Sequence, residues 1–301
     1  MKKLFVAVIA LMMTLSASAQ FYIYFSDGTV AKVDSISMIA PAEPVQGLFS
    51  VSATKQVTFS PGNLQYTQST NTWSFASAQW EMLGTDNVTG GYVESDPTYG
   101  DFKYGTDLAD KIDLFGWSTS ATYFGVNTST DENDYSGSFV DWGTNKIGND
   151  APNTWRTLTY EEWDYLRSGR SNASSLCGIA QVNGINGLIF LPDNWVCPAG
   201  VTFKSGFHSS YGTEYYAAYQ TFTAEQWSKL ESAGAVFLPA TGNRYNSNVI
   251  SLYESGRYWS ATESDSNIAV ASMLGVYSDG VRMYDNPRYN GHSVRLVQDL
   301  Q

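Results

Sequence analysis

Histidine and cysteine are almost absent from this chain, which has two of each among 301 residues. With no cluster of these residues, the sequence has no zinc site with ligands at a plausible spacing. Charged residues are also sparse, at 15%, and the formal net charge is -12. Nucleic acids and anionic membranes attract basic surfaces, so this acidic balance argues against both as partners.

Long apolar runs are missing beyond the N-terminus, where none approaches the roughly 18 residues of a membrane helix. Residues 1–19 have another character. Lys2 and Lys3 precede an apolar stretch, and Ala17-Ser18-Ala19 has the small-x-small pattern that a signal peptidase cleaves. We therefore expect an export signal and a protein without a membrane span, located in the periplasm, at the cell surface or outside the cell.

The few cysteines and histidines leave little scope for nucleophilic chemistry. In an oxidising compartment Cys177 and Cys197 could form one disulfide, and two reduced, buried thiols are the alternative. Neither His208 nor His292 lies near a nucleophile motif, and each is expected at the surface or in a turn.

One helix start is written twice in the chain, as "LTYEEW" from Leu158 and "FTAEQW" from Phe222. Thr159 with Glu162, and Thr223 with the Gln three residues on, have the spacing of a capping box. The apolar residue before each Thr and the Trp after it have the spacing of a hydrophobic staple. The sequence predicts helices near 159–168 and 223–233, and a weaker one near 77–83.

After each of these helices comes an apolar run that contains Phe-Leu-Pro, in "GLIFLPDNW" from Gly187 and "AVFLPATGNRY" from Ala235. Each run is short enough for a buried strand that ends at the Pro. The repeated unit is therefore predicted to be a helix followed by a strand. Trp163, Trp227 and Trp259 are expected in the core.

The rest of the chain predicts one α+β domain with few helices. Residues 20–44 form a hairpin around Asp27-Gly28 and a Pro-rich linker, and residues 45–301 form the domain. Two strands with a turn at residues 61–63 are expected between 49 and 66. Residues 84–150 show little periodicity, which is typical of a functional loop or of a region held by packed aromatic side chains.

Three segments carry a resemblance to a known family. They are "RTLTYEEWDYLRSGR" from Arg156, "GRYWSATES" from Gly256, and the closing "GHSVRLVQ" from Gly291. The chain resembles the formylglycine-generating (sulfatase-modifying factor) branch of the C-type lectin-like fold over roughly residues 45–299. It is most similar to exported Bacteroidetes and Fibrobacter paralogues of the major paralogous-domain type. The matching positions are Thr159, Glu162, Trp163, Tyr165, Arg167, Gly291, Val294 and Arg295.

The resemblance implies a fold more than a reaction. Oxidase members use a pair of reactive cysteines near the C-terminal end, and residues 198–301 contain no Cys. Lectins of the wider fold hold Ca²⁺ through Glu-Pro-Asn or Gln-Pro-Asp and Trp-Asn-Asp motifs, none of which is present. We therefore expect no cofactor. The run "DENDYSG", which begins at Asp131, is not an EF-hand loop, because it lacks the Gly that such a loop requires. A looser Ca²⁺ site in this run is left open.

Residues 256–291 are dense in Tyr, Asn, Ser, Asp and Arg, a mixture typical of recognition surfaces, although ordinary hairpin turns are the alternative. Strands Tyr258-Trp259-Ser260 and Val294-Arg295-Leu296 are expected to alternate in and out of the core and to give Arg295 a structural role. Ligand contacts would then come from the loops between Arg257 and Asn290. The expected contact residues are Tyr277, Arg282, Tyr284, Asn286 and Tyr289, with Arg282 as a donor to the ligand.

These observations favour an exported, non-catalytic binding module that recognises a glycan or a protein at or beyond the cell surface. One alternative is a divergent enzyme, either an oxidase-fold relative or a hydrolase that uses carboxylates such as Glu161 and Glu162. Another is a structural surface protein without a ligand pocket.

Overall fold

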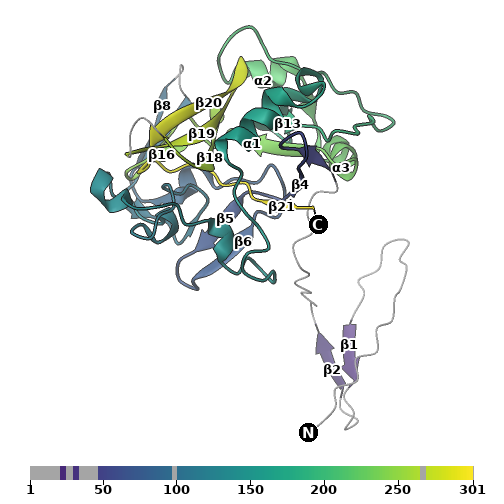
Figure 1. Ribbon diagram of the computed structural model, residues 1–301. Coiled ribbons are helices and arrows are strands. Elements are labelled where there is room, and N and C mark those ends of the chain that lie inside the picture. The colour runs from purple at the N-terminus through teal and green to yellow at the C-terminus, as the bar shows by residue number, and fades with distance from the viewer. Residues whose placement is uncertain (1–20, 25–29, 34–46, 97–99, 265–268, 301) are drawn as a thin grey trace. The chain divides into compact units, whose positions relative to one another are not determined.

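The computed structural model describes residues 21–24, 30–33, 47–96, 100–264 and 269–300 of the chain (Figure 1). The chain divides into two units, Met1–Ile39 and Ala40–Gln301. In the first unit β1 (Phe21–Tyr24) and β2 (Val30–Val33) pair antiparallel. The expected export signal, the Asp27-Gly28 turn and the Pro-rich linker lie outside the described residues.

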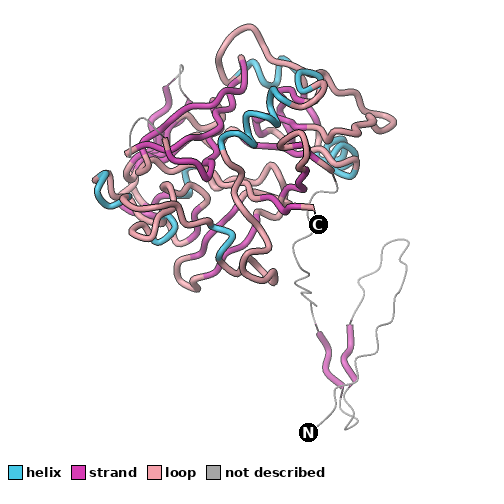
Figure 2. Tube along the Cα trace, viewed as in Figure 1, coloured by secondary structure: helices cyan, strands magenta, loops and turns pink. Residues whose placement is uncertain are grey.

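The second unit mixes many short strands with few helices (Figure 2). Its helices are α1 (Tyr160–Asp164), α2 (Glu214–Tyr219) and α3 (Ala224–Ser232), with a π turn at Tyr165–Gly169 and 3₁₀ turns at Gly84–Asn87, Tyr123–Gly125, Glu132–Tyr135, Trp142–Thr144 and Ala173–Ser175. Its strands are β3 (Phe49–Ser50), β4 (Gln56–Phe59), β5 (Leu64–Thr67), β6 (Thr72–Phe75), β7 (Val88–Thr89), β8 (Tyr92–Asp96), β9 (Gly100–Tyr104), β10 (Asp107–Leu108), β11 (Lys111–Ile112), β12 (Cys177–Val182), β13 (Ile185–Phe190), β14 (Thr221–Phe222), β15 (Val236–Pro239), β16 (Asn243–Tyr245), β17 (Asn248–Ile250), β18 (Ser255–Glu263), β19 (Val270–Tyr277), β20 (Gly280–Pro287) and β21 (Val297–Asp299).

Both repeated helix starts are confirmed as capping boxes. In α1 the Thr159 hydroxyl accepts from the Glu162 N–H, and the Glu162 carboxylate accepts from the Thr159 N–H. Thr223 and Gln226 make the same pair of hydrogen bonds at the start of α3. The local signal was sufficient here because these bonds connect residues only three positions apart.

The other helix expectations are wrong in two places. Residues 77–83 form no helix: 77–80 are bends and turns, and 81–83 are irregular. The Glu81 carboxylate accepts from the Ser77 N–H, which stabilises this turn instead of a helix. Helix α2 was not expected, because it has no side-chain cap. Its packing stabilises it instead: Tyr216 is fully buried, and its hydroxyl donates to the Glu254 carbonyl.

The two Phe-Leu-Pro runs lie side by side in the sheet β14-β12-β13-β15. Strand β13 pairs antiparallel with β15, so that Leu188 lies opposite Leu238. The predicted helix-strand unit needs one correction, since β12 intervenes between α1 and β13 and forms a hairpin with β13. The small residues of β12, Gly178 and Ala180, gave little apolar signal for this strand.

Strands β18, β19 and β20 form a three-stranded antiparallel sheet, where the sequence predicted a strand at 258–260 and loops up to Asn290. Helix α1 packs against all three strands, and Figure 1 shows it running beside them. Tyr258 and Leu274 lie in the core cluster that contains Trp163 of α1. Trp259 and Met273 lie in a second cluster, which shows that the sheet is buried on both faces.

This two-sided burial corrects the expected in-and-out alternation. Tyr258, Trp259 and Ser260 are all fully buried, and so are residues 294–296, which precede β21 and lie outside any strand. Side chains that alternate across a strand are all buried when both faces are covered. Trp163, Trp227 and Trp259 are confirmed as core residues with no exposed surface.

Aromatic side chains hold the irregular region 84–150 in place. Trp117 and Trp142 are fully buried, and their indole N–H groups donate to the carbonyls of Ser260 and Phe124. Upstream, residues 49–66 contain three strands, one more than expected. Strand β4 pairs with β3 and β21 while β5 pairs with β6 and β11, so the turn at 61–63 carries the chain between two sheets.

The capping residue Glu162 also forms an ion pair, which gives a first prediction. Burial alone would raise the pKa of Glu162, but hydrogen bonds from Arg156 and the Thr159 N–H outweigh it and lower the pKa. A carboxyl with a lowered folded-state pKa adds stability above its unfolded pKa and loses it as pH falls through the folded value. We expect Glu162→Gln to lower the free energy of unfolding by about 1 kcal/mol at pH 7, because the amide keeps the cap and loses the charge.

The difference between this variant and the wild type should shrink on acidification to about pH 4, as measured by urea unfolding across pH. The matched control is Glu225→Gln in the first turn of α3, whose exposed carboxylate forms no ion pair with any described residue. A pH-independent difference for Glu162→Gln would contradict the ion-pair contribution.

The buried Trp163 gives a second prediction. Trp163→Ala should lower the free energy of unfolding by about 3–5 kcal/mol, because it opens a cavity in the central cluster, the core cluster that Trp163 shares with Tyr258 and Leu274. Trp163→Phe should cost clearly less, since the indole N–H has no hydrogen-bond partner among the described residues. Urea unfolding followed by circular dichroism measures both, and full stability of the Ala variant would show that Trp163 is not a core residue.

Candidate functional site

One end of the sheet β18-β19-β20 carries a surface that we call the tyrosine face, formed by Tyr211, Tyr277, Tyr284, Arg257 and Arg282. Arg257 lies opposite Gly275, which lies opposite Arg282 on the next strand. Residues paired across antiparallel strands project from the same face of the sheet. Tyr258 and Leu274, the next residues to Arg257 and Gly275, project from the other face into the cluster that contains Trp163 of α1. The tyrosine face is therefore opposite to the face that α1 covers.

Gly275 allows the tyrosine rings to lie close to the sheet. A Cβ atom at this position would be 2.7 Å from Cε2 of Tyr277 and 3.1 Å from Cδ2 of Tyr284. Only a residue without a side chain leaves room for both rings in this arrangement. The backbone of β19 thus serves as the floor of the site.

Three tyrosine rings meet above this floor. The centroid of Tyr277 is 5.8 Å from that of Tyr211 and 6.0 Å from that of Tyr284, and the ring of Tyr284 is nearly perpendicular to it. Tyr211 is 44% exposed and Tyr284 is 41% exposed, whereas Tyr277 is half-buried. Two accessible rings therefore each contact a packed one.

Tyr211 comes from a loop that hydrogen bonds attach to the β19–β20 turn. The Ser278 carbonyl accepts from the His208 N–H at 2.8 Å, and the Ser278 hydroxyl accepts from the Gly212 N–H and donates to the Ser210 carbonyl. Ser278 is fully buried. The loop on both sides of Tyr211 is held by these bonds.

Arg282 lies over the ring of Tyr277, with its Cζ 5.6 Å from the ring centroid. Its two terminal nitrogens donate to the two carboxylate oxygens of Asp279, each at 2.9 Å. These bonds lower the pKa of Asp279. The expected role of Arg282 as a donor to the ligand stays a prediction, because a guanidinium has five N–H groups and Asp279 accepts from two of them.

The phenol groups of Tyr211 and Tyr277 stay protonated at neutral pH. Burial raises the pKa of Tyr277, against the opposing effect of nearby Arg257. Burial and the adjacent Glu254 carboxylate raise the pKa of Tyr211. The tyrosine face therefore offers neutral hydroxyls and the paired Arg282, and the Nε of half-buried Arg257 has no hydrogen-bond partner among the described residues.

The structure brings together three of the five residues that the sequence predicted, Tyr277, Arg282 and Tyr284. Asn286 continues the same face of β20, and its side-chain oxygen accepts from Asn290. Tyr289 lies beyond β20 and packs edge-on against Tyr245, with centroids 5.8 Å apart.

Sequence reasoning missed two members of the site. Arg257 and Trp259 are two residues apart on β18 and project from the same face, and this spacing could have indicated Arg257. No local pattern indicates Tyr211, which the Ser278 contacts bring to β19 from 66 residues earlier in the chain.

The two cysteines are free, and they differ from both alternatives that the sequence left open. Cys177 is buried in the central cluster, and burial raises its pKa to about 12. Such a thiol is not ionised at neutral pH and is a poor nucleophile. Cys197 is exposed, so the expectation of two buried thiols holds only for Cys177.

His292 is another correction, because it is fully buried and lies 4.3 Å from the ring of Trp259 instead of at the surface. Burial lowers its pKa well below the usual value, which leaves the imidazole neutral. His208 lies in a loop, as expected, and stacks on Tyr215.

The acidic residues considered for calcium or hydrolysis are engaged locally. Asp131 caps the 3₁₀ turn Glu132–Tyr135, and Asp134 accepts from the Ser129 hydroxyl. Among the residues that the structure describes, no group of three or more His, Cys, Asp or Glu side chains is placed to hold a metal ion. The same residues include no helix long and apolar enough to cross a membrane.

The close fit at Gly275 gives a third prediction. Gly275→Ala should lower the free energy of unfolding by about 1–3 kcal/mol, because the new methyl group displaces the ring of Tyr277. In a Tyr277→Ala background the same substitution should cost much less, and a double-mutant cycle measured by urea unfolding reports the difference. An equal cost in both backgrounds would show that the ring and Gly275 are not coupled.

Comparison of the chain with protein-family models, curated proteins and solved structures finds no match, so the tyrosine face is interpreted from its residues alone.

Proposed function

We propose that the protein is an exported, non-catalytic binding module that recognises a glycan or a protein at or beyond the cell surface through the tyrosine face. The fold that we propose for it is C-type lectin-like, of the sulfatase-modifying factor type. One observation carries the proposal: the accessible rings of Tyr211 and Tyr284 are both held against the half-buried ring of Tyr277.

The physical basis is preorganisation. Tyrosine supplies a large contact area with few rotatable bonds, and rings already packed in the free protein lose little conformational entropy on binding. Asp279 fixes Arg282 over Tyr277, which completes a surface of the composition found at binding hot spots. The Tyr277 hydroxyl, protonated at neutral pH, can donate to a sugar hydroxyl or to a backbone carbonyl.

The enzyme alternative has less support from the same geometry. Cys177 is buried with a raised pKa, and the Glu162 carboxylate accepts from Arg156 at 2.6 and 2.8 Å. A general acid or a nucleophile must be free to reach a substrate. These groups instead stabilise the fold.

The fourth prediction tests the tyrosine face. A glycan array probed with the purified protein should identify a ligand, and the double variant Tyr211→Ala/Tyr284→Ala should bind it at least about tenfold more weakly. The melting temperature should change little, since both rings are accessible.

The matched control is Tyr92→Ala/Tyr245→Ala, which removes two rings that are at least as accessible and lie outside the tyrosine face. An equal loss of affinity in this control, or full affinity in the first variant, would move the site elsewhere. If no glycan binds, the same two variants apply to a protein ligand from the exported fraction of the cell that makes this protein.

A further inference from the structure

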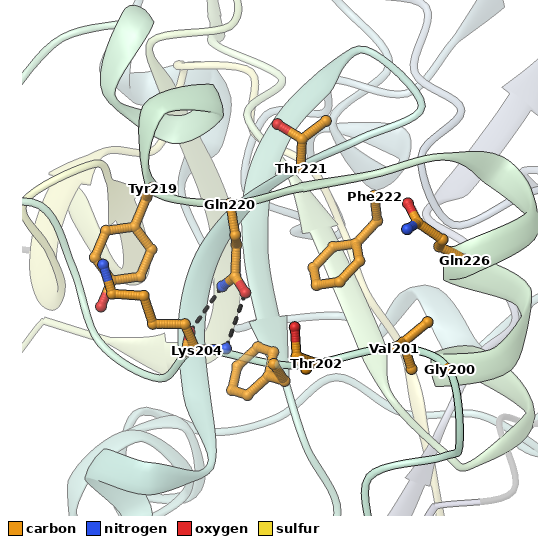
Figure 3. A pocket seen from close by; sticks show the side chains of 10 residues that line it. Gly200, Val201, Thr202, Lys204, Tyr219, Gln220, Thr221, Phe222 and Gln226 are labelled. Carbon is orange, nitrogen blue, oxygen red and sulfur yellow. Dashed lines mark hydrogen bonds between the residues drawn. The ribbon is translucent and has the colours of Figure 1, made fainter.

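A concave site lies at the edge of the sheet β14-β12-β13-β15, and none of the residues that line it belongs to the tyrosine face. It is a groove of about 580 Å³ between strand β14 and the extended segment 200–204. Figure 3 shows Phe222 and Gln226 on one side of it and Val201 and Lys204 on the other. Its volume is within the range of ligand sites.

One wall of the groove is the free edge of a strand. The carbonyls of Gln220 and Phe222 accept from the N–H groups of Gln181 on β12 and of Asn183, the residue after β12. In a parallel ladder the residue between two such carbonyls directs its own N–H and C=O to the other side, so those of Thr221 point away from β12. Among the described strands, β14 has no partner on that side.

The opposite wall is held at a distance by one side chain. The Gln220 amide accepts from the Lys204 N–H at 3.0 Å and donates to the Lys204 carbonyl at 2.8 Å, as the dashed lines in Figure 3 show. The amide thus bonds to both backbone groups of Lys204, as a neighbouring strand would. Beyond this contact the segment and β14 separate, and the groove occupies the space between them.

The groove is electrostatically unlike the rest of the chain. None of its ten lining residues is acidic, although the chain has 29 Asp and Glu against 17 Lys and Arg. The Lys204 ammonium lies 3.7 Å from the centroid of the Tyr219 ring. No described carboxylate forms an ion pair with it. A cation is therefore positioned at one end of the groove without an anionic partner.

The lining favours a peptide over a sugar. Saccharides stack on open aromatic faces, but the Tyr219 ring is covered by Lys204 and Phe222 is only 5% exposed. A peptide strand instead needs a free strand edge for its backbone and pockets for alternate side chains, and Thr221 and the apolar groups of Val201 and Phe203 provide them.

We propose that this groove binds an extended acidic peptide segment of a partner protein, which adds as a strand to the free edge of β14 and places a carboxylate on Lys204. This site goes beyond the proposed function, because it shares no residue with the tyrosine face.

The fifth prediction uses a phage-displayed library of random linear dodecapeptides, panned on the purified full chain. Enriched peptides should share an acidic side chain within a strand-forming sequence. A synthetic copy, measured by fluorescence anisotropy, should bind Lys204→Glu about tenfold more weakly and Lys204→Arg with nearly wild-type affinity. Thr221→Pro removes the free N–H without breaking the β12 ladder and should also weaken binding.

Two controls separate this site from general effects. Lys146→Glu makes the same charge change at an exposed position outside the groove and should leave affinity unchanged. Tyr211→Ala/Tyr284→Ala should also leave the affinity for the peptide unchanged. The groove proposal and the tyrosine-face proposal can therefore fail independently. The proposal is overturned if no peptide is enriched, if Lys204→Glu and Thr221→Pro bind normally while folded, or if Lys204→Glu abolishes binding of a glycan instead.

Discussion

The sheet β18-β19-β20 must be buried on both faces, and much of the molecule is arranged to satisfy this requirement. One face supplies Tyr258 and Leu274 to the cluster beneath α1, and the other supplies Trp259 and Met273 to the cluster beneath the irregular region. A strand that is buried on both faces exposes its polar side chains only where the segments packed on the sheet end. The cover on the second face ends near Gly275, and the tyrosine face begins there.

One arginine links the start of α1 to the last strand, β21. The Arg156 backbone pairs with Val297, and its guanidinium donates to both Glu162 and Asp299. A capping residue thereby becomes part of a link between the helix start and the last strand. The second helix start carries a neutral Gln226 at the same position and has no such link. The same local motif thus acts as a simple cap in α3 and as a tertiary contact in α1.

The two proposed binding sites follow from different physical features. The tyrosine face depends on rings packed over a glycine, with Asp279 pairing the nearby Arg282. The groove depends on unpaired strand backbone and on Lys204, which lies over the Tyr219 ring and forms no ion pair with a described carboxylate. Because the chain as a whole is acidic, such an unpaired cation favours an anionic group of a partner at this position.

The sequence by itself determined the features that depend on neighbours a few residues apart: the capping boxes at Thr159 and Thr223, the Phe-Leu-Pro strands and the burial of their tryptophans. It also indicated three of the five residues of the tyrosine face, Tyr277, Arg282 and Tyr284, from the composition of residues 256–291. Only the tertiary structure decided that these three residues lie on β19 and β20 and that the sheet is covered on both faces. It alone brought Tyr211 to Tyr277, because that contact depends on Ser278 binding a distant loop and no local periodicity encodes it.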